Sequence, residues 1–309
     1  MLYHIDPFWN NGKTYTSKSY RNVVVFGTYN RAHLMRQSMY AYSESLTVED
    51  AVVVLDDGST DDTFEVCEQY SNTSGGMDVF YFRLEDKQPG EWRDSAAFLN
   101  MGISFAIYAL NSKRVIPTHP EIVPGWMTFK AINESEEALQ GVDFLMFRGY
   151  YLPIELQLRY EAYVNVAKAG QLAFEWSIRQ FKALCPDWYS YGDPSHDFHP
   201  NNLERDPQPF RSWIFCSATA EVWKRYGGFA ESNIWGAAAD LNFMARRHHG
   251  GFTIATPIEI DAWVLHQNHD DPKYNTVTPR NMDLCMQTAA ILDETPCQPH
   301  LLDPNRWKP

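Results

Sequence analysis

The chain has 309 residues, of which 44% are hydrophobic and 21% are charged, so it is not a mostly disordered chain and can bury a sizeable core. Its formal net charge of −13 disfavours long contacts with phosphate backbones or anionic membranes. We expect no transmembrane helix and no signal peptide, because no apolar run approaches roughly 18 residues and residues 1–13 lack a basic-then-apolar order. The five cysteines are scattered without a CxxC pair, which is typical of reduced thiols in a cytoplasmic protein.

Short apolar runs alternate with helical patterns in the N-terminal part of the chain. The expected strands are 22–26, 51–55, 78–84 and 114–116, and the expected helices are 31–44, 64–70 and 93–110. This alternation predicts an α/β fold with a mixed but mainly parallel central sheet flanked by helices. Ligands bind at the carboxyl ends of strands in such sheets, so the turns 28–31, 56–59 and 119–121 should meet in one cleft.

The remainder of the chain has an aromatic-rich insertion followed by a second α/β portion. The insertion is expected to be helical in part over 154–184 and a loop over 185–211, and its aromatic side chains either shape a binding site or fill the core. Around it we expect strands at 142–147, 212–217, 252–256 and 260–265, and helices at 134–140, 221–226, 239–248 and 280–292.

Two adjacent carboxylates, Asp56 and Asp57, follow the second expected strand and are followed by Gly58 and Ser59. Carboxylates at a strand end are well placed to accept hydrogen bonds from a nucleobase or ribose. The alternative is a capped turn without function, because Asp, Gly and Ser are ordinary turn residues. Asp61 or Asp62 then caps the helix that follows.

The segments Val23–Arg31 and Leu55–Asp61 resemble the opening of family 2-like glycosyltransferases with the GT-A fold. That family uses a nucleotide-sugar donor, and an Asp of its Asp–Asp–Gly–Ser turn holds the nucleobase. Gly27 is a departure, since the family usually has Pro there. The resemblance implies donor contacts from six residues: Thr28, Tyr29, Asn30, Arg31, Asp56 and Asp57.

The segment Ala97–Ile103 is similar to the family's Ala–x–x–Asn–x–Gly helix, which lies near the donor diphosphate. The resemblance makes Asn100 a donor-binding candidate. An Arg often precedes that Asn in the family, whereas Leu99 stands here. Arg93, earlier in the same expected helix, is the candidate for the missing cation.

A divalent cation, Mn²⁺ or Mg²⁺, is implied by the family's Asp–x–Asp motif. In the best register His119 and Glu121 stand where the two aspartates belong, and a carboxylate with an imidazole suits Mn²⁺ better than Mg²⁺. Some family members add a late His as a further ligand, for which His266 is the candidate and His269 its competitor. The alternative is a Pro-rich loop with an exposed Glu.

The segments Gly227–Glu231 and Trp235–Leu241 resemble the family's Gly–Gly–Phe–x–Glu and Gly–x–x–Glu–Asp motifs. The second motif opens a helix at the acceptor site, so Trp235 and Gly236 are expected to contact the acceptor. Its Asp is the general base in inverting members, a role that falls to Asp240, although Ala239 replaces the family's Glu. The alternative is that Asp240 only caps the helix.

The resemblance divides the chain into an N-terminal extension (1–20), a nucleotide-sugar-binding half (21–130), an aromatic-rich insertion (131–210), an acceptor-binding half (211–270) and a C-terminal tail (271–309). It implies metal-dependent, inverting transfer of a sugar from a UDP-linked donor to a hydroxyl of a glycan, a small molecule or a modified nucleobase.

Three other functions are open at this point. The first is a non-catalytic nucleotide-sugar or glycan-binding protein, which Ala239 and the altered Asp–x–Asp motif favour. The second is sugar transfer onto a hydroxylated DNA base, which the net charge disfavours. The third is a metal-dependent hydrolase using His196 and His199, for which no partner ligands stand at matching spacing.

Overall fold

The computed structural model describes thirteen stretches of the chain. They are residues 1–5, 18–71, 76–87, 95–125, 127–138, 142–152, 156–157, 203–205, 215–229, 231, 251–257, 262–268 and 299–307.

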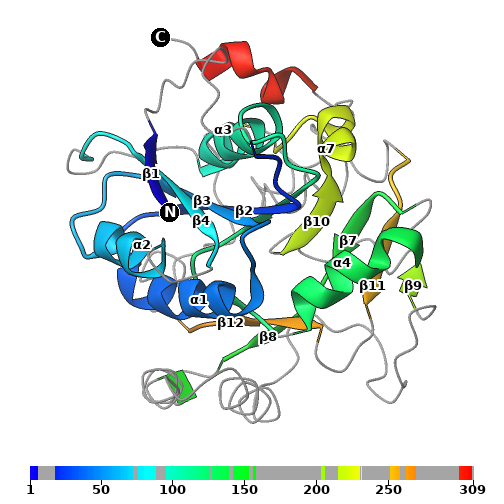
Figure 1. The fold of residues 1–309 in the computed structure, drawn as a ribbon, viewed down its shortest axis with the longest axis horizontal. Coiled ribbons are helices and arrows are strands. Elements are labelled where there is room, and N and C mark those ends of the chain that lie inside the picture. Colours follow the sequence, from blue (N-terminus) through cyan, green and yellow to red (C-terminus); the bar gives the residue numbers. More distant parts are fainter. Residues whose placement is uncertain are drawn as a thin grey trace, which may run out of the picture.

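A nine-stranded mixed sheet forms the centre of the described structure (Figure 1). Across the sheet the strands run in the order β1 (Leu2–Ile5), β4 (Asp78–Arg83), β3 (Ala51–Asp56), β2 (Asn22–Thr28), β5 (Arg114–Thr118), β10 (Cys216–Thr219), β7 (Phe144–Met146), β11 (Ile254–Pro257) and β9 (Leu203–Arg205). The first five are mutually parallel, whereas β10 runs antiparallel to both β5 and β7. This arrangement confirms the predicted mixed, mainly parallel sheet.

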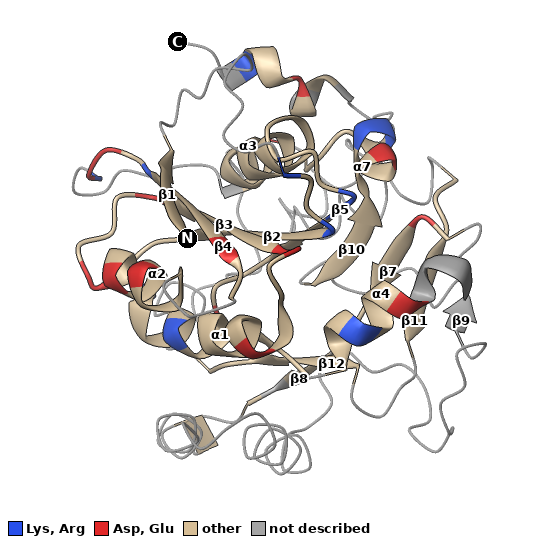
Figure 2. Ribbon diagram, viewed as in Figure 1, with Lys and Arg blue, Asp and Glu red and all other residues tan. Residues whose placement is uncertain are grey.

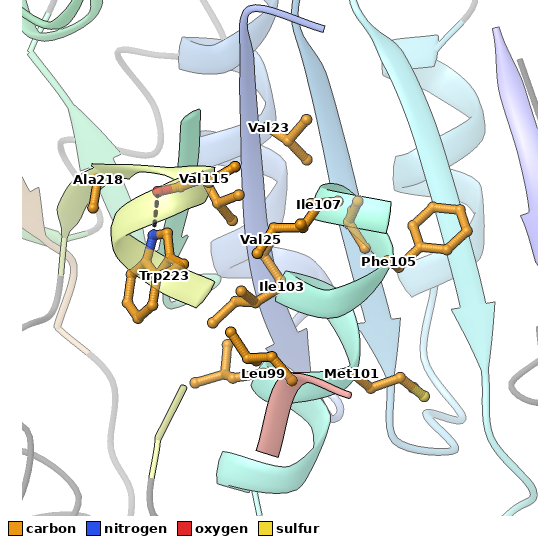
Figure 3. Packing of buried hydrophobic residues seen from close by; sticks show 14 of the residues in the cluster. Val23, Val25, Leu99, Met101, Ile103, Phe105, Ile107, Val115, Ala218 and Trp223 are labelled. Atoms are coloured by element: carbon orange, nitrogen blue, oxygen red, sulfur yellow. Dashed lines mark hydrogen bonds between the residues drawn. The ribbon is translucent and has the colours of Figure 1, made fainter. Parts of the chain in front are cut away.

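Alternate residues of the central strands face opposite layers of helices, as the pleat of a strand requires. In β2, Val23 and Val25 belong to the core beneath α3 (Ser95–Tyr108), where they lie with Ile103 (Figure 3). Val24 and Phe26 belong to the core on the other face, which α1 (Ala32–Ser45) and α2 (Thr63–Ser71) cover. Burial on both faces explains why the strand is an unbroken apolar run.

Helix α3 lies very close to the sheet because it has a glycine at the contact. A β-carbon at Gly102 would lie 2.4 Å from Val25 Cγ1 and 2.8 Å from Leu55 Cδ1. No larger side chain fits there without moving the helix away from the strands.

Helix α7 (Ala220–Tyr226) follows β10 and covers the same face as α3. Thr219 Oγ1 caps it by accepting a hydrogen bond from Val222 N at 3.2 Å. The indole of Trp223, completely buried, donates to the carbonyl of Val115 on β5 at 3.1 Å (Figure 3). The second α/β portion is thereby bonded to the first.

A second, smaller sheet contains three strands. Its order is β6 (Ile122–Pro124), β12 (Trp263–His266) and β8 (Arg148–Tyr151), with β12 antiparallel to β6 and parallel to β8. Register places His266 opposite Ile122, and therefore next to Glu121.

Three further helical elements complete the described structure. They are α4 (Thr128–Ala138) and two C-terminal 3₁₀ turns, η2 (Pro299–Leu302) and η3 (Pro304–Trp307). Within the described ranges, no helix has the length and apolarity that crossing a membrane demands. Lys and Arg are scattered over separate elements, among them α1, α4, α7 and the C-terminal segment (Figure 2).

Most of the expected elements are confirmed within a few residues of their bounds, although α4 begins at Thr128 and not at residue 134. Strands β6 and β8 were not expected, and β9 forms within 185–211, where a loop was expected. Further differences lie at the two ends of the chain. No strand was expected before residue 22, yet β1 pairs with β4 through the register Leu2–Val79 to Ile5–Phe82. No element was expected at 299–307, where η2 and η3 form. The expected helices 239–248 and 280–292 lie outside the described residues.

Candidate active site

The turns that follow β2 and β3 are bonded to each other at the carboxyl edge of the sheet. Asn30 N donates to Ser59 Oγ at 2.9 Å, and Thr60 N donates to Asn30 Oδ1 at 2.8 Å. Asp57 N donates to the carbonyl of Thr28 at 2.9 Å. Asn30 has a φ of 52°, a left-handed conformation that Asn adopts more readily than most residues. The two turns therefore form one unit.

Asp61 holds the starts of two helices. Its Oδ2 accepts from Ala32 N at 2.8 Å, at the first residue of α1, and its Oδ1 accepts from Thr63 N at 3.2 Å, at the first residue of α2. A carboxylate at two helix N-termini stabilises both. This confirms the predicted capping role of Asp61.

Asp56 is buried, with 1% of its surface exposed, and its carboxylate is held by the protein itself. It accepts hydrogen bonds from Tyr81 Oη at 2.5 Å, Ser59 N at 2.8 Å and Arg83 Nη1 at 3.2 Å. Burial and the bond to Asp56 raise the pKa of Tyr81, which keeps the phenol protonated as a donor. These contacts make Asp56 a residue that shapes the turn, and its predicted contact with a donor stays a prediction.

Asp57 pairs with Lys87, a cation that the sequence analysis missed. Lys87 Nζ contacts Asp57 Oδ2, and it also lies over the ring of Tyr29, 4.1 Å from the centroid. Both side chains of the pair are largely buried, at 13% and 11% exposure, whereas Tyr29 is 41% exposed. Two predicted donor residues, Asp57 and Tyr29, therefore contact the same cation.

Gly58 explains why Lys87 reaches Asp57. Gly58 has a φ of 79°, and a β-carbon there would lie 2.5 Å from the carbonyl oxygen of Glu85. The chain after β4 therefore lies directly on the Asp–Asp–Gly–Ser turn. A signal existed in the sequence, because residues 84–87 also follow a parallel strand and so lie at the same edge.

The predicted metal ligands lie together at the next strand end. Glu121 Oε1 is 3.4 Å from His119 Nδ1 and 3.8 Å from His266 Nε2. Glu121 and His266 are buried, whereas His119 is about one-third exposed. His266 Nδ1 is 2.8 Å from the carbonyl of Gln267, so the nitrogen that faces Glu121 is Nε2.

These contacts are not a formed metal centre. Within the described residues, no group of three or more His, Cys, Asp or Glu side chains is arranged to hold an ion. The structure brings His119 and His266 to Glu121 in separate pairwise contacts, and their roles as ligands stay predictions.

Gln267 fixes the backbone around Glu121. Its backbone N–H and its side-chain Nε2 both donate to the carbonyl of Glu121, at 3.1 and 3.2 Å. Nε2 also donates to the carbonyl of Leu34 on α1 at 2.9 Å, and Ser38 on the same helix donates to the carbonyl of Pro120 at 2.7 Å. Helix α1, which begins beside the turns that follow β2 and β3, therefore holds the turn at residues 119–121 as well.

Asn100 is completely buried and binds the protein chain. Its Oδ1 accepts from Phe229 N at 2.7 Å, and its Nδ2 donates to the carbonyl of Phe229 at 2.7 Å and to Glu231 Oε1 at 2.9 Å. In this structure its amide joins α3 to the Gly227–Glu231 segment. The predicted contact with the donor diphosphate stays a prediction.

Several predicted site residues lie outside the described part of the chain. These are the donor candidate Arg93, the acceptor candidates Trp235 and Gly236, the candidate base Asp240 and the competing ligand candidate His269. The described residues Thr28, Asp57 and Glu121 do meet at one edge, because β3, β2 and β5 are parallel neighbours.

Residues 23–103 match the family model described as Glycosyl transferase family 2. The match covers β2 to α3, and so includes both donor turns and Asn100. Together with the fold, this match confirms the resemblance of the segment to family 2-like glycosyltransferases with the GT-A fold that was seen in the sequence. None of the curated proteins matches the sequence.

The fold is similar to that of solved structures of S. aureus TarS. Residues 1–349 of S. aureus TarS in complex with UDP-GlcNAc are 15% identical, with a TM-score of 0.56 over 88% of this chain and 66% of that chain. A second structure of residues 1–349 of TarS is 16% identical to this chain, with a TM-score of 0.54. The match covers 88% of this chain and 65% of that chain. Glucosyl-3-phosphoglycerate synthase from Mycobacterium tuberculosis, in complex with Mn²⁺, UDP and phosphoglyceric acid, is 14% identical with a TM-score of 0.49, covering 90% of this chain and 80% of that chain.

Proposed function

We propose that the protein transfers a sugar from a UDP-linked donor to a hydroxyl acceptor, with inversion at the anomeric carbon. The observation that carries this proposal is the joined pair of turns after β2 and β3, with Asp57 and Lys87 between them. These turns lie within the segment that matches the glycosyltransferase family. UDP is the nucleotide favoured, because the S. aureus TarS fragment of the same fold was solved with UDP and with UDP-GlcNAc.

Donor binding is assigned to the edge formed by Thr28, Tyr29, Asn30 and Asp57. Asp57 accepts a hydrogen bond from the base or ribose, and the exposed ring of Tyr29 offers a face beside it. Lys87 supplies positive charge in a chain with a net charge of −13. An enclosed lysine at this edge adds local positive charge for one nucleotide without creating the basic face that a nucleic acid needs.

The chemistry of the donor atoms near Glu121 supports a divalent cation, although their arrangement is not that of a formed metal centre. One carboxylate oxygen with two imidazole nitrogens at 3.4 and 3.8 Å is a mixed O/N donor set, which suits Mn²⁺ better than Mg²⁺. We propose that Glu121 holds the ion with His266 or His119. Such an ion, when bound, offsets the negative charge that develops on the departing diphosphate.

Asp240 is proposed as the general base. Its carboxylate takes the proton of the acceptor hydroxyl while that oxygen attacks the anomeric carbon. The bond from that carbon to the diphosphate oxygen breaks in the same step, so UDP leaves with the bonding electrons.

We also propose that the enzyme works in the cytoplasm. Cys67 and Cys216 are buried free thiols, and burial raises the pKa of Cys67 and keeps it protonated.

The direct test is a panel of sugar nucleotides, UDP-GlcNAc among them, assayed by thermal shift and by UDP release with and without MnCl₂. At least one donor should raise the melting temperature and release UDP, because a ligand that binds the folded state stabilises it. Binding without turnover would favour the non-catalytic alternative that Ala239 suggests. If no sugar nucleotide binds, the proposed function is wrong.

Lys87→Met should weaken UDP binding by about 10- to 150-fold, because a charge-assisted contact of this kind is worth about 1.5 to 3 kcal/mol. The measurement is isothermal titration of UDP. Lys130→Met on α4 is the matched control, since Lys130 forms only an exposed pair with Glu134 and should leave the affinity unchanged. Equal affinity of wild type and Lys87→Met would remove Lys87 from the donor site.

A further inference from the structure

Helix α1 turns one buried face toward the turn that carries Glu121. Leu34, Ser38 and Tyr42 are spaced four residues apart on this helix, so they follow one another along the same face. All three are buried. The carbonyl of Leu34 accepts a hydrogen bond from Gln267, and the hydroxyls of Ser38 and Tyr42 donate to the turn itself.

Three successive carbonyls of the turn accept hydrogen bonds from buried side chains. Ser38 Oγ donates to the carbonyl of Pro120 at 2.7 Å, and Tyr42 Oη donates to that of Ile122 at 3.3 Å. Between them, the carbonyl of Glu121 accepts from Gln267 Nε2 at 3.2 Å. Because a buried carbonyl without a partner is costly, these bonds favour one path of the backbone on both sides of Glu121.

The path of the backbone determines where the Glu121 carboxylate lies. Its Oε1 is 3.4 Å from His119 Nδ1 and 3.8 Å from His266 Nε2. We propose that Ser38 and Tyr42 are positioning residues for Glu121, because their hydroxyls hold the carbonyls on either side of it. The role of Glu121 toward a divalent cation rests on the proposed function, whereas the positioning rests on the contacts of described residues alone.

The sequence of α1 supports a particular role for Ser38. Ser is a weaker helix former than Ala, and this Ser is completely buried. Ser38 Oγ also lies 3.0 Å from the carbonyl of Met35, a contact that Ser43 repeats with the carbonyl of Tyr40 at 2.7 Å. Ser38 adds to this local contact a bond to Pro120, 82 residues away. Replacing either Ser by Ala therefore makes the same local change, but only one replacement affects the turn.

Titration of UDP at increasing MnCl₂ tests the proposal. Ser38→Ala should raise the Mn²⁺ concentration that gives half of the ion's effect on UDP affinity by about 10-fold, the lower end of the range for residues that support a metal ligand. The UDP affinity in EDTA should stay within about 2-fold of wild type. Tyr42→Phe, which removes only the hydroxyl, should act in the same direction. Ser43→Ala is the matched control and should behave like wild type.

Hydrogen–deuterium exchange of the full chain measures the positioning without nucleotide or ion. In Ser38→Ala, peptides within 117–125 should exchange about 5-fold faster, because the N–H of Ile122 is bonded to the carbonyl of His119 at 3.2 Å within the loosened turn. Peptides from α2 should keep their wild-type rates. Melting temperatures recorded alongside show that Ser38→Ala and Tyr42→Phe are folded.

The outcomes separate this proposal from the proposed function. Equal exchange of 117–125 in wild type, Ser38→Ala and Tyr42→Phe would overturn the positioning role. An equal loss of UDP affinity with and without the ion would also overturn it, because general damage to the fold acts in both conditions. A wild type whose UDP affinity does not respond to Mn²⁺ would refute the proposed metal dependence, while the exchange rates would still decide whether Ser38 and Tyr42 position Glu121.

Discussion

Glu121→Gln should weaken UDP binding in the presence of MnCl₂ by at least about 100-fold, down to the affinity measured in EDTA. Residues that only support a metal ligand are typically worth about 10- to 100-fold in metal affinity, so losing a direct ligand should cost more. The amide keeps the shape of the Glu121 side chain but removes its negative charge, which lies near both His119 and His266. Titration of UDP with and without the ion measures the effect.

The control for Glu121→Gln is Glu134→Gln, the same chemical change at an exposed position of α4. It should leave the Mn²⁺ response unaltered. Because Glu121 is buried, the melting temperature and the metal-free UDP affinity of the variant must also be measured, to show that it is folded. An Mn²⁺ response equal to that of the wild type in folded Glu121→Gln would exclude Glu121 as a ligand.

Asp240→Asn should lower kcat by about 100- to 10,000-fold, the range typical of a lost general base, and leave the UDP dissociation constant unchanged. An amide cannot take a proton from the acceptor hydroxyl, whereas it retains the size of the carboxylate. Steady-state UDP release and UDP titration together distinguish this result from a loss of donor binding.

Asp62→Asn, at an exposed position before α2, is the control for Asp240→Asn and should turn over at the wild-type rate. If Asp240→Asn retains near-normal turnover, another group removes the proton, and Asp240 returns to the alternative of a helix cap. A parallel loss of UDP affinity would instead place Asp240 in donor binding.

The carboxyl edge of the sheet was predictable because its elements are local. Strands such as Val23–Phe26 are unbroken apolar runs, and the turns after them begin where those runs stop. Parallel neighbours bring such turns to one edge whatever the details of packing. Thr28, Asp57 and Glu121 were therefore placed together correctly from the sequence alone.

Contacts between distant segments were not predictable in the same way. Lys87 reaches Asp57 because Gly58 lets the chain after β4 lie against the turn, and Gln267 reaches Glu121 because β12 pairs with β6. Asn100 resembled a donor ligand in sequence, yet its amide binds Phe229, 129 residues further along the chain.

The amino-acid sequence by itself determined the alternating strands and helices between residues 22 and 118, the family resemblance and the positions of the polar turns, because hydrophobic periodicity and turn chemistry act over a few residues. Only the tertiary structure decided which polar side chains form hydrogen bonds within the protein. Asp56 binds Ser59 in its own turn, Asn100 binds Phe229, and Arg306 binds Glu231. The physical reason is that the partner of a buried polar group is set by which distant segments pack against it, and local sequence patterns carry no record of that packing.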